Sequence, residues 1–213
     1  MMIPKLHYIS QDTTPKKCLE NIQKACTSGV ELVQLRFKNA SEKKMLKLAK
    51  DVLEITTHYQ TRLIINGHYK VAKAIKADGV HLESTDVCPT IVRKHLESWQ
   101  IIGATANTLQ DCETLISKAV DYVMLSPFRA TPDQDDLGEV LGLKGFTAIT
   151  DALQTETPIL GFGGITTNDV TAILKSGVSG IAATKAIDQN FDAIKVFNHL
   201  LSASSTQEQR HTF

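Results

Sequence analysis

Two basic side chains and an amide share one side of a strand-like segment near the N-terminus. In ELVQLRFK (residues 31–38), Gln34, Arg36 and Lys38 occupy alternate positions, so they project from the same face of an extended chain. Two cations at one strand end suit a phosphate or a diphosphate, because a guanidinium offers two parallel N–H donors to such an anion. We therefore predict that this strand end binds a phosphorylated ligand, the alternative being a solvated end or a salt bridge to a neighbouring acid.

A pair of glycines ends another strand-like segment, in GFGGITTND (residues 161–169). Gly163 and Gly164 let backbone N–H groups approach a ligand closely, and a helix N-terminus beyond them adds partial positive charge. We expect that helix to be capped by Thr166, Thr167 or Asn168. The next strand-like segment ends in Thr184 and Lys185, and the lysine adds a full charge. These residues predict a second phosphate site, the alternative being a tight turn alone.

Polar side chains follow the other strand-like segments, where they either contact a substrate or turn the chain. They are Asn66 and His68, Glu83 and Asp86, Thr105 and Asn107, and Arg129, Thr131 and Asp133. His68 is equally compatible with a catalytic position and with a turn. His81 lies in the middle of its segment, which favours packing over catalysis. The acidic run Asp133, Asp135 and Asp136 is typical of a solvated loop, with metal binding as the alternative.

The elements that carry these residues alternate between strand and helix. Eight β-rich runs lie at 6–10, 31–38, 62–68, 79–84, 100–107, 122–127, 158–164 and 180–184. The segments between them have apolar residues at helical spacing, for example Met45, Leu48 and Val52 after a capping Ser41. Parallel strands need crossover helices of this kind, and eight such units close into a (β/α)₈ barrel.

A single-domain α/β barrel is therefore the predicted fold, covering residues 1–203, with a flexible tail at 204–213. A doubly wound open sheet is the alternative, which the lack of a GxGxxG motif after the first strand disfavours. In a barrel, the carboxyl ends of the strands form one rim, where active sites lie. The candidate residues above all follow strand ends, so we expect them to meet at that rim.

The composition limits the class of partner and the compartment. Lys plus Arg and Asp plus Glu number 23 each among 213 residues, which disfavours nucleic acid as a partner. The N-terminus lacks a signal-peptide apolar stretch, and no apolar run is long enough to span a membrane. The four scattered cysteines are expected to be reduced thiols. We predict a cytoplasmic protein, and the sequence is compatible with a homo-oligomer.

Motifs along most of the chain resemble one enzyme family. VQLRFK, IIN–H, ADGVHL–––D, IIGAT, DYVMLSPFRAT, GFGGI and GVSGIAATKAI occur, in this order, between about residue 6 and residue 200. They resemble thiamine phosphate synthase and its relative TenI, a thiazole tautomerase. The resemblance implies a (β/α)₈ barrel that couples a hydroxymethylpyrimidine diphosphate to a thiazole phosphate and releases diphosphate, with Mg²⁺ assisting.

The resemblance also implies a role for individual residues. Arg36 and Lys38 match the basic residues that bind the diphosphate, and Asn66, Thr105 and Thr131 match polar residues of the synthase site. Asp86 matches one of two metal-binding aspartates. Gly164, Thr184 and Lys185 match the region that binds the thiazole phosphate, and Gln34 and Gly163 extend these two groups as candidate substrate contacts. His68 is the candidate titrating group.

Four positions depart from the two family patterns. Gly67 stands where the synthase has its second metal-binding aspartate, and Asp133 and Gln134 stand where it has a threonine and a diphosphate-binding lysine. Asn107 stands where TenI has its proton-transferring histidine. These departures predict weak or diphosphate-dependent Mg²⁺ binding and weakened synthase activity. The alternatives are a TenI-like enzyme, a non-catalytic protein that binds a thiamine-related phosphate, or another phosphate-binding barrel that shares only the scaffold.

Overall fold

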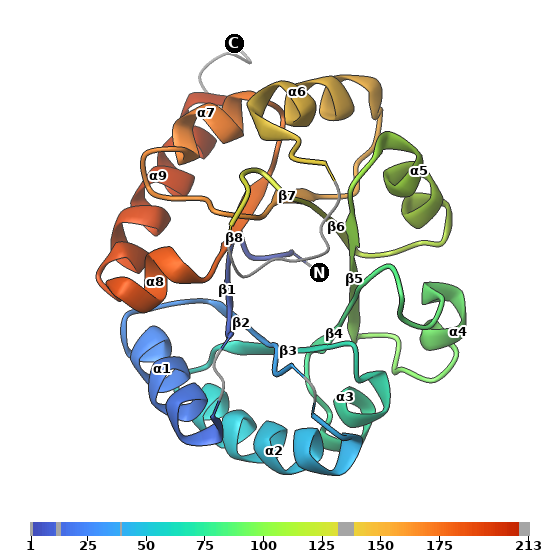
Figure 1. Cartoon of the computed structure of the whole chain (residues 1–213), viewed down its shortest axis with the longest axis vertical. Helices are drawn as coiled ribbons and strands as arrows, with labels where there is room; N and C mark the ends of the chain where they lie inside the picture. Colours follow the sequence, from blue (N-terminus) through green and yellow to red (C-terminus); the bar gives the residue numbers. More distant parts are fainter. Residues whose placement is uncertain (1, 12–13, 39, 132–138, 209–213) are drawn as a thin grey trace.

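The computed structural model describes residues 2–11, 14–38, 40–131 and 139–208, and its strands close into a parallel barrel in sequence order (Figure 1). The strands are β1 (Leu6–Ile9), β2 (Leu32–Leu35), β3 (Arg62–Asn66), β4 (Gly79–Leu82), β5 (Ile101–Ala106), β6 (Tyr122–Leu125), β7 (Ile159–Gly161) and β8 (Gly180–Ala183). Each lies within one of the predicted segments, so the predicted (β/α)₈ barrel is confirmed.

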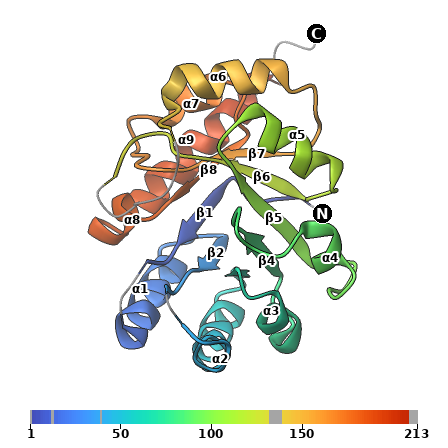
Figure 2. The ribbon, with the colours of Figure 1, turned by 45° about the vertical axis from the view of Figure 1, so that its right-hand side comes forward.

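Helices surround the barrel on all sides, as the oblique view in Figure 2 also shows. They are α1 (Pro15–Thr27), α2 (Glu42–His58), α3 (Tyr69–Ile75), α4 (Pro89–Arg93), α5 (Leu109–Ser117), α6 (Gly142–Ala152), α7 (Val170–Lys175), α8 (Lys185–Gln189) and α9 (Ala193–Glu208). Ser41 caps α2 as predicted, because its hydroxyl accepts the N–H of Lys44. No helix in the described part of the chain is both long enough and apolar enough to cross a membrane.

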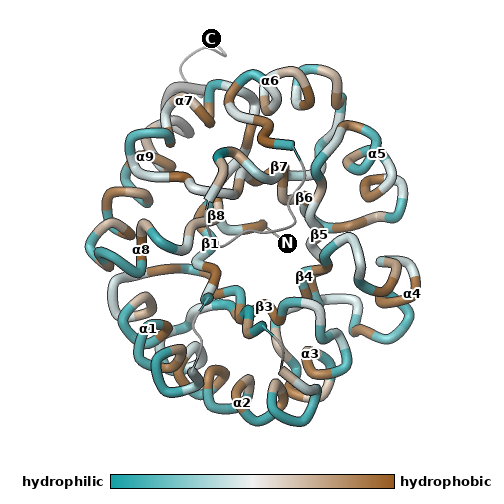
Figure 3. Tube along the Cα trace, viewed as in Figure 1, coloured by the Kyte–Doolittle hydropathy of each residue, from teal (hydrophilic) through white to brown (hydrophobic). Residues whose placement is uncertain are grey.

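Both faces of the barrel wall are buried, which explains why the strands are apolar along their whole length. One core cluster fills the interior: Ile9, Leu32, Ile64, Ile101, Tyr122, Met124, Leu160, Phe162 and Ala182. The alternate residues of the same strands, such as Val33 and Ile65, pack against the inner sides of the helices. In α2 the hydrophilic residues lie on the outer side of the ring (Figure 3). The alternation thus assigns every strand residue to the interior or to the helix layer.

The structure differs from the sequence predictions in three helices. Helix α7 begins at Val170, because Asp169 accepts the N–H and the hydroxyl of Thr166 and closes a turn ahead of the helix. The prediction of a cap at Thr166, Thr167 or Asn168 is therefore wrong. The short helix α8 lies between β8 and α9 and was not predicted. Helix α9 continues to Glu208, within the segment 204–213 that was predicted to form a flexible tail.

Candidate active site

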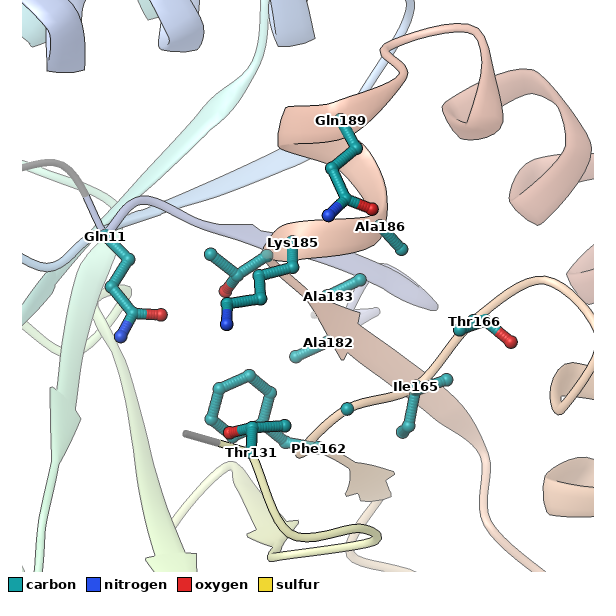
Figure 4. A pocket seen from close by; sticks show the side chains of 12 residues that line it. Gln11, Thr131, Phe162, Ile165, Thr166, Ala182, Ala183, Lys185, Ala186 and Gln189 are labelled. Carbon is teal, nitrogen blue, oxygen red and sulfur yellow. The ribbon is translucent and has the colours of Figure 1, made fainter. Parts of the chain in front are cut away.

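A pocket of about 220 Å³ opens at the carboxyl ends of β7 and β8 (Figure 4). Four of the predicted substrate contacts line it: Thr131, Gly164, Thr184 and Lys185. Further lining residues were not predicted: Gln11, Phe162, Ile165, Thr166, Ala182, Ala183, Ala186 and Gln189. The side chains of Gln11, Thr131 and Lys185 converge on the cavity from three separate segments. Residues from the predicted phosphate site thus line a concavity together with the side chain of Lys185, and phosphate binding there stays a prediction.

The two glycines shape the wall of this pocket. Gly163 and Gly164 have φ angles of 106° and 68°, which disfavour any residue with a side chain. A Cβ atom on Gly163 would lie 2.9 Å from the Phe128 nitrogen, and one on Gly164 would lie 3.0 Å from Cγ2 of Thr131. Glycine at both positions therefore allows the loop after β7 to pack directly on the loop after β6.

Thr184 supplies an unsatisfied hydroxyl at the same place. Its side chain is 8% exposed, and its Oγ1 has no hydrogen-bond partner in the described part of the protein. A buried polar group without a partner costs about 1–3 kcal/mol. Because Thr184 lines the pocket beside Lys185, a bound anion would provide the missing partner and lie next to a positive charge.

Thr184→Val is expected to affect folding and binding in opposite directions. The isosteric change removes an unpaired buried hydroxyl, so the ligand-free protein should unfold at the same or a higher temperature. Affinity for inorganic phosphate should fall about tenfold, the equivalent of one hydrogen bond to a charged group. Thermal unfolding and calorimetric titration measure the two effects, and Thr184→Ser is the control that keeps the hydroxyl. Unchanged phosphate affinity in Thr184→Val would show that the Thr184 hydroxyl does not bind the phosphate.

Arg129 links the loop after β6 to the loop after β7, beside the pocket, through hydrogen bonds to residues of the same chain. Its guanidinium donates to the carbonyl of Gly164 at 2.5 Å and to Asp169 at 2.9 and 3.2 Å. Burial by itself would raise the pKa of Asp169, but the hydrogen bonds from Arg129 and from Thr166 outweigh burial, and the pKa is lowered. We define Arg129 and Asp169 as the loop clamp, which holds the Gly164 backbone in place.

The loop clamp should stabilise the fold in a pH-dependent way. An aspartate with a lowered pKa stabilises the folded state above its unfolded pKa of about 3.9 and loses that effect as the pH falls through the folded value. The stability difference between the wild type and Asp169→Asn should therefore be full near neutral pH and vanish in strong acid. Urea unfolding across this range measures it. Asp192→Asn is the control, since its ion pair with Lys195 is exposed and should contribute little; an equal effect there would contradict the clamp.

The predicted diphosphate contacts lie at the ends of β2 and β3. The Gln34 amide donates to the Asn66 side-chain oxygen at 2.5 Å, and Gln34 Oε1 is buried without a partner among the described residues. Arg36 is half-buried, and Ser10 Oγ hydrogen-bonds both its backbone N–H and its carbonyl, at 3.1 and 3.2 Å. Lys38 is exposed. Gln34 and Asn66 are thus brought together, and Arg36 is fixed beside them on the rim.

The predicted metal ligand Asp86 faces Gly67. A Cβ atom on Gly67 would lie 3.4 Å from both carboxylate oxygens of Asp86. The carboxylate accepts the N–H of Glu83 at 2.8 Å. Burial raises the pKa of Asp86. The backbone hydrogen bond from Glu83 lowers it, the charge of Glu83 raises it and the charge of His68 lowers it, and the net shift is upward. No cluster of three or more metal-ligating side chains occurs within the described residues.

Thr105 and Asn107, at the end of β5, have different partners. Thr105 Oγ1 lies 2.8 Å from Nε2 of His81, which is fully buried in the barrel. Asn107 donates from its amide to the carbonyl of Ser126 at 2.7 Å, and its backbone N–H donates to Asp111 at 3.2 Å. Asn107 therefore links the ends of β5 and β6, whereas Thr105 belongs to the interior network.

The comparison with known proteins agrees with this geometry. A family model described as thiamine monophosphate synthase matches residues 6–187.

The chain belongs to the thiamine monophosphate synthase family.

Relatives in this family cover almost the whole chain. The thiamine-phosphate synthase of Flavobacterium johnsoniae is 36% identical over 192 residues, which are 89% of this chain and 91% of that protein. The enzyme of the same name from Bacteroides fragilis is 33% identical over 200 residues, 92% of this chain and 98% of that protein. A solved thiamine phosphate pyrophosphorylase from Pyrococcus furiosus has a TM-score of 0.78 at 26% identity, covering 93% of this chain and 96% of that one. The family resemblance inferred from the ordered motifs is confirmed.

Three of the eight unpredicted pocket residues illustrate why the sequence did not indicate them. Phe162 alternates with the interior Leu160, so its position could have been inferred from strand periodicity. Gln11 follows the end of β1 but belongs to none of the motifs, and Gln189 lies in the unpredicted helix α8. Four residues of the acidic loop, Asp133, Gln134, Asp135 and Asp136, lie outside the described residues.

Proposed function

We propose that this protein is a thiamine phosphate synthase, a transferase that couples a hydroxymethylpyrimidine diphosphate to a thiazole phosphate. The observation that carries the proposal is the presence of two groups of basic and polar side chains on one barrel rim. The pocket beside Thr184 and Lys185 suits the thiazole phosphate, and the strand ends with Arg36 and Asn66 suit the diphosphate. Relatives named thiamine-phosphate synthase over about nine-tenths of this chain support it.

The reaction we propose forms one bond and breaks another at the pyrimidine methylene carbon. The carbon–oxygen bond to the diphosphate breaks, leaving a pyrimidine cation, and the thiazole nitrogen donates its electron pair to that carbon. Negative charge grows on the leaving diphosphate, so donors fixed on the rim lower the barrier. Arg36 stabilises this charge, and the pocket beside Lys185 orients the thiazole phosphate for attack.

Mg²⁺ fits this site as a partner of the substrate diphosphate. Asp86 supplies one carboxylate, and Mg²⁺ is commonly held by one or two carboxylates together with substrate phosphates. When bound, the ion would neutralise charge on the diphosphate. Gly67 removes the second carboxylate, so we expect weak binding to the free protein. The metal requirement stays a prediction, as do a cytoplasmic location and a homo-oligomer.

Turnover of both substrates is the direct test. The purified protein with Mg²⁺ and the two substrates should produce thiamine phosphate and inorganic diphosphate in equal amounts, identified by mass spectrometry and a diphosphate assay. Binding of thiazole phosphate without product would instead indicate a non-catalytic binding protein. Neither binding nor product would indicate another phosphate-binding barrel.

A TenI-like isomerase is the second candidate, and the geometry favours it less. The side chain at the position of the TenI histidine is Asn107, which cannot act as an acid or base at neutral pH. Its amide is bonded to the Ser126 carbonyl, which gives it a structural role. Isomerisation of a thiazole phosphate without any coupling to the pyrimidine would reverse this preference.

A further inference from the structure

Three side chains from neighbouring strands form a hydrogen-bonded chain inside the barrel. Tyr122 Oη on β6 lies 2.9 Å from Nδ1 of His81 on β4, and His81 Nε2 lies 2.8 Å from Oγ1 of Thr105 on β5. Tyr122 and His81 are fully buried, whereas Thr105 is partly exposed at the end of its strand. The chain therefore runs from the barrel interior to the rim.

The barrel makes room for this chain at a glycine. Gly103 pairs with His81 on one side and with Tyr122 on the other. A Cβ atom on Gly103 would lie 2.0 Å from the Tyr122 ring, so only glycine lets the phenol cross β5 to reach the histidine. The His81 and Tyr122 rings stack with centroids 5.6 Å apart. The arrangement is thus specified by packing as well as by hydrogen bonds.

The protonation states of the two rings limit the direction of the hydrogen bonds. Burial, together with the smaller effect of the charge of Arg36, lowers the pKa of His81 to about 3, so the ring is neutral at physiological pH. Burial also raises the pKa of Tyr122, which keeps its hydroxyl protonated. A neutral imidazole has one donor and one acceptor, so only two directions are consistent. In one, Tyr122 donates to Nδ1 and Nε2–H donates to Thr105; in the other, both bonds are reversed.

The surroundings of Tyr122 favour the first direction. In the reversed chain the tyrosine hydroxyl hydrogen would need another acceptor, and Tyr122 has no other hydrogen bond among the described residues. The ring of His7 lies edge-on to the same ring, with centroids 5.1 Å apart, but the described structure contains no hydrogen bond between His7 and the Tyr122 hydroxyl. A buried donor without an acceptor costs free energy. In the first direction the hydrogens of Tyr122 and of His81 Nε2 both have acceptors, and the hydrogen left over is that of Thr105, at the partly exposed end of the chain, where it points outward.

We infer that Tyr122 and His81 are positioning residues that hold the Thr105 hydroxyl as a hydrogen-bond donor toward an anionic oxygen at the rim. Nε2–H of His81 occupies the acceptor side of Thr105, so the hydroxyl offers its proton to the ligand. The identity of that ligand rests on the proposed function, which makes it an oxygen of the substrate diphosphate. The donor is then fixed before charge develops on the leaving group.

The histidine tautomer tests the inference without any need for turnover. Nitrogen-15 NMR should assign the Nε2–H form to His81 in the wild type, and Tyr122→Phe should move the Nδ1 signal toward that of an acceptor nitrogen without a hydrogen bond, because the donor to Nδ1 is lost while the ring is kept. Tyr8→Phe is the matched control: it removes a buried hydroxyl that donates to Asp188 on the helix side of the wall, and should leave the His81 signals unchanged. An Nδ1–H His81 in the wild type would overturn the inference.

A double-mutant cycle tests whether Tyr122 acts through Thr105. Tyr122→Phe should lower kcat about tenfold and Thr105→Val about 10²-fold, with KM for thiazole phosphate unchanged. Tyr122→Phe should have no further effect in the Thr105→Val background, and Thr105→Ser should restore the dependence. An equal loss in both backgrounds would mean a merely structural role and overturn the inference. If the wild type makes no product, the proposed function fails, and the same cycle on the affinity for inorganic diphosphate then decides the inference alone.

Discussion

Arg36→Met is expected to lower kcat for thiamine phosphate formation by about 10²- to 10³-fold, the cost of removing one donor that stabilises developing charge. Arg36 extends the line of Gln34 on β2, and Ser10 fixes its backbone. Its charge also lowers the pKa of His81, although burial has the larger effect. The loss should therefore fall on the step in which the diphosphate departs, and KM for thiazole phosphate should change little.

Two variants separate position from charge in this experiment. Arg36→Lys keeps the cation but loses the two-pronged donor, so it should recover only part of kcat. Arg62→Met removes an arginine from the opposite end of the barrel, where its guanidinium donates to the carbonyl of Met2 at 2.6 Å, and it should leave kcat unchanged. Steady-state rates with each substrate varied give kcat and both KM values. Near-normal kcat in a folded Arg36→Met would exclude Arg36 from the diphosphate site.

Gly67→Asp combined with Gln134→Lys is expected to raise kcat by about tenfold or more, because each change adds a group that stabilises charge on the leaving diphosphate. The structure supports the first change directly, since a Cβ on Gly67 would lie 3.4 Å from both oxygens of Asp86. An aspartate there would place a second carboxylate beside the first, which suits Mg²⁺. Calorimetry should find tighter Mg²⁺ binding in Gly67→Asp than in the wild type.

The main structural risk of this substitution is the backbone at residue 67. Gly67 has a φ of 71°, a conformation that asparagine and aspartate tolerate better than most residues. Gly67→Asn is therefore the matched control: it has the same size and strain but no charge. Without Mg²⁺ the aspartate variant should be less stable than the asparagine variant, since two close carboxylates repel, and Mg²⁺ should reverse that order. Equal Mg²⁺ affinity in Gly67→Asp and Gly67→Asn would contradict the hypothesis that Gly67 limits metal binding.

The eight strands and the rim were predictable from the sequence for a physical reason. Strands of a barrel are buried on both faces, so each is a short apolar run, and polar side chains begin where the strand reaches solvent. Arg36, Asn66, Thr105 and Lys185 stand at such ends. Gly163 and Gly164 were also predictable, because a pair of glycines at a strand end indicates a close backbone approach.

The tertiary structure alone determined which polar side chains have a hydrogen-bond or ion-pair partner within the protein and which could bind a ligand. The sequence alone did not indicate a partner for Arg129. Folding brings a carboxylate oxygen of Asp169 to within 2.9 Å of its guanidinium nitrogen. The start of α7 was missed because the same carboxylate closes a turn ahead of the helix. Helix α8 was missed because five residues are too few for a periodic pattern.

The same distinction applies to the buried network and the pocket. The sequence indicated that His81 is a packed barrel residue, but its partners Tyr122 and Thr105 depend on the register of three strands and on the space above Gly103. The Thr184 hydroxyl, which has no partner among the described residues, is likewise buried only once the chain has folded around it. Local patterns determine where a strand begins and ends. The partner of a buried polar atom is determined by residues distant in the chain, and therefore only by the closed barrel.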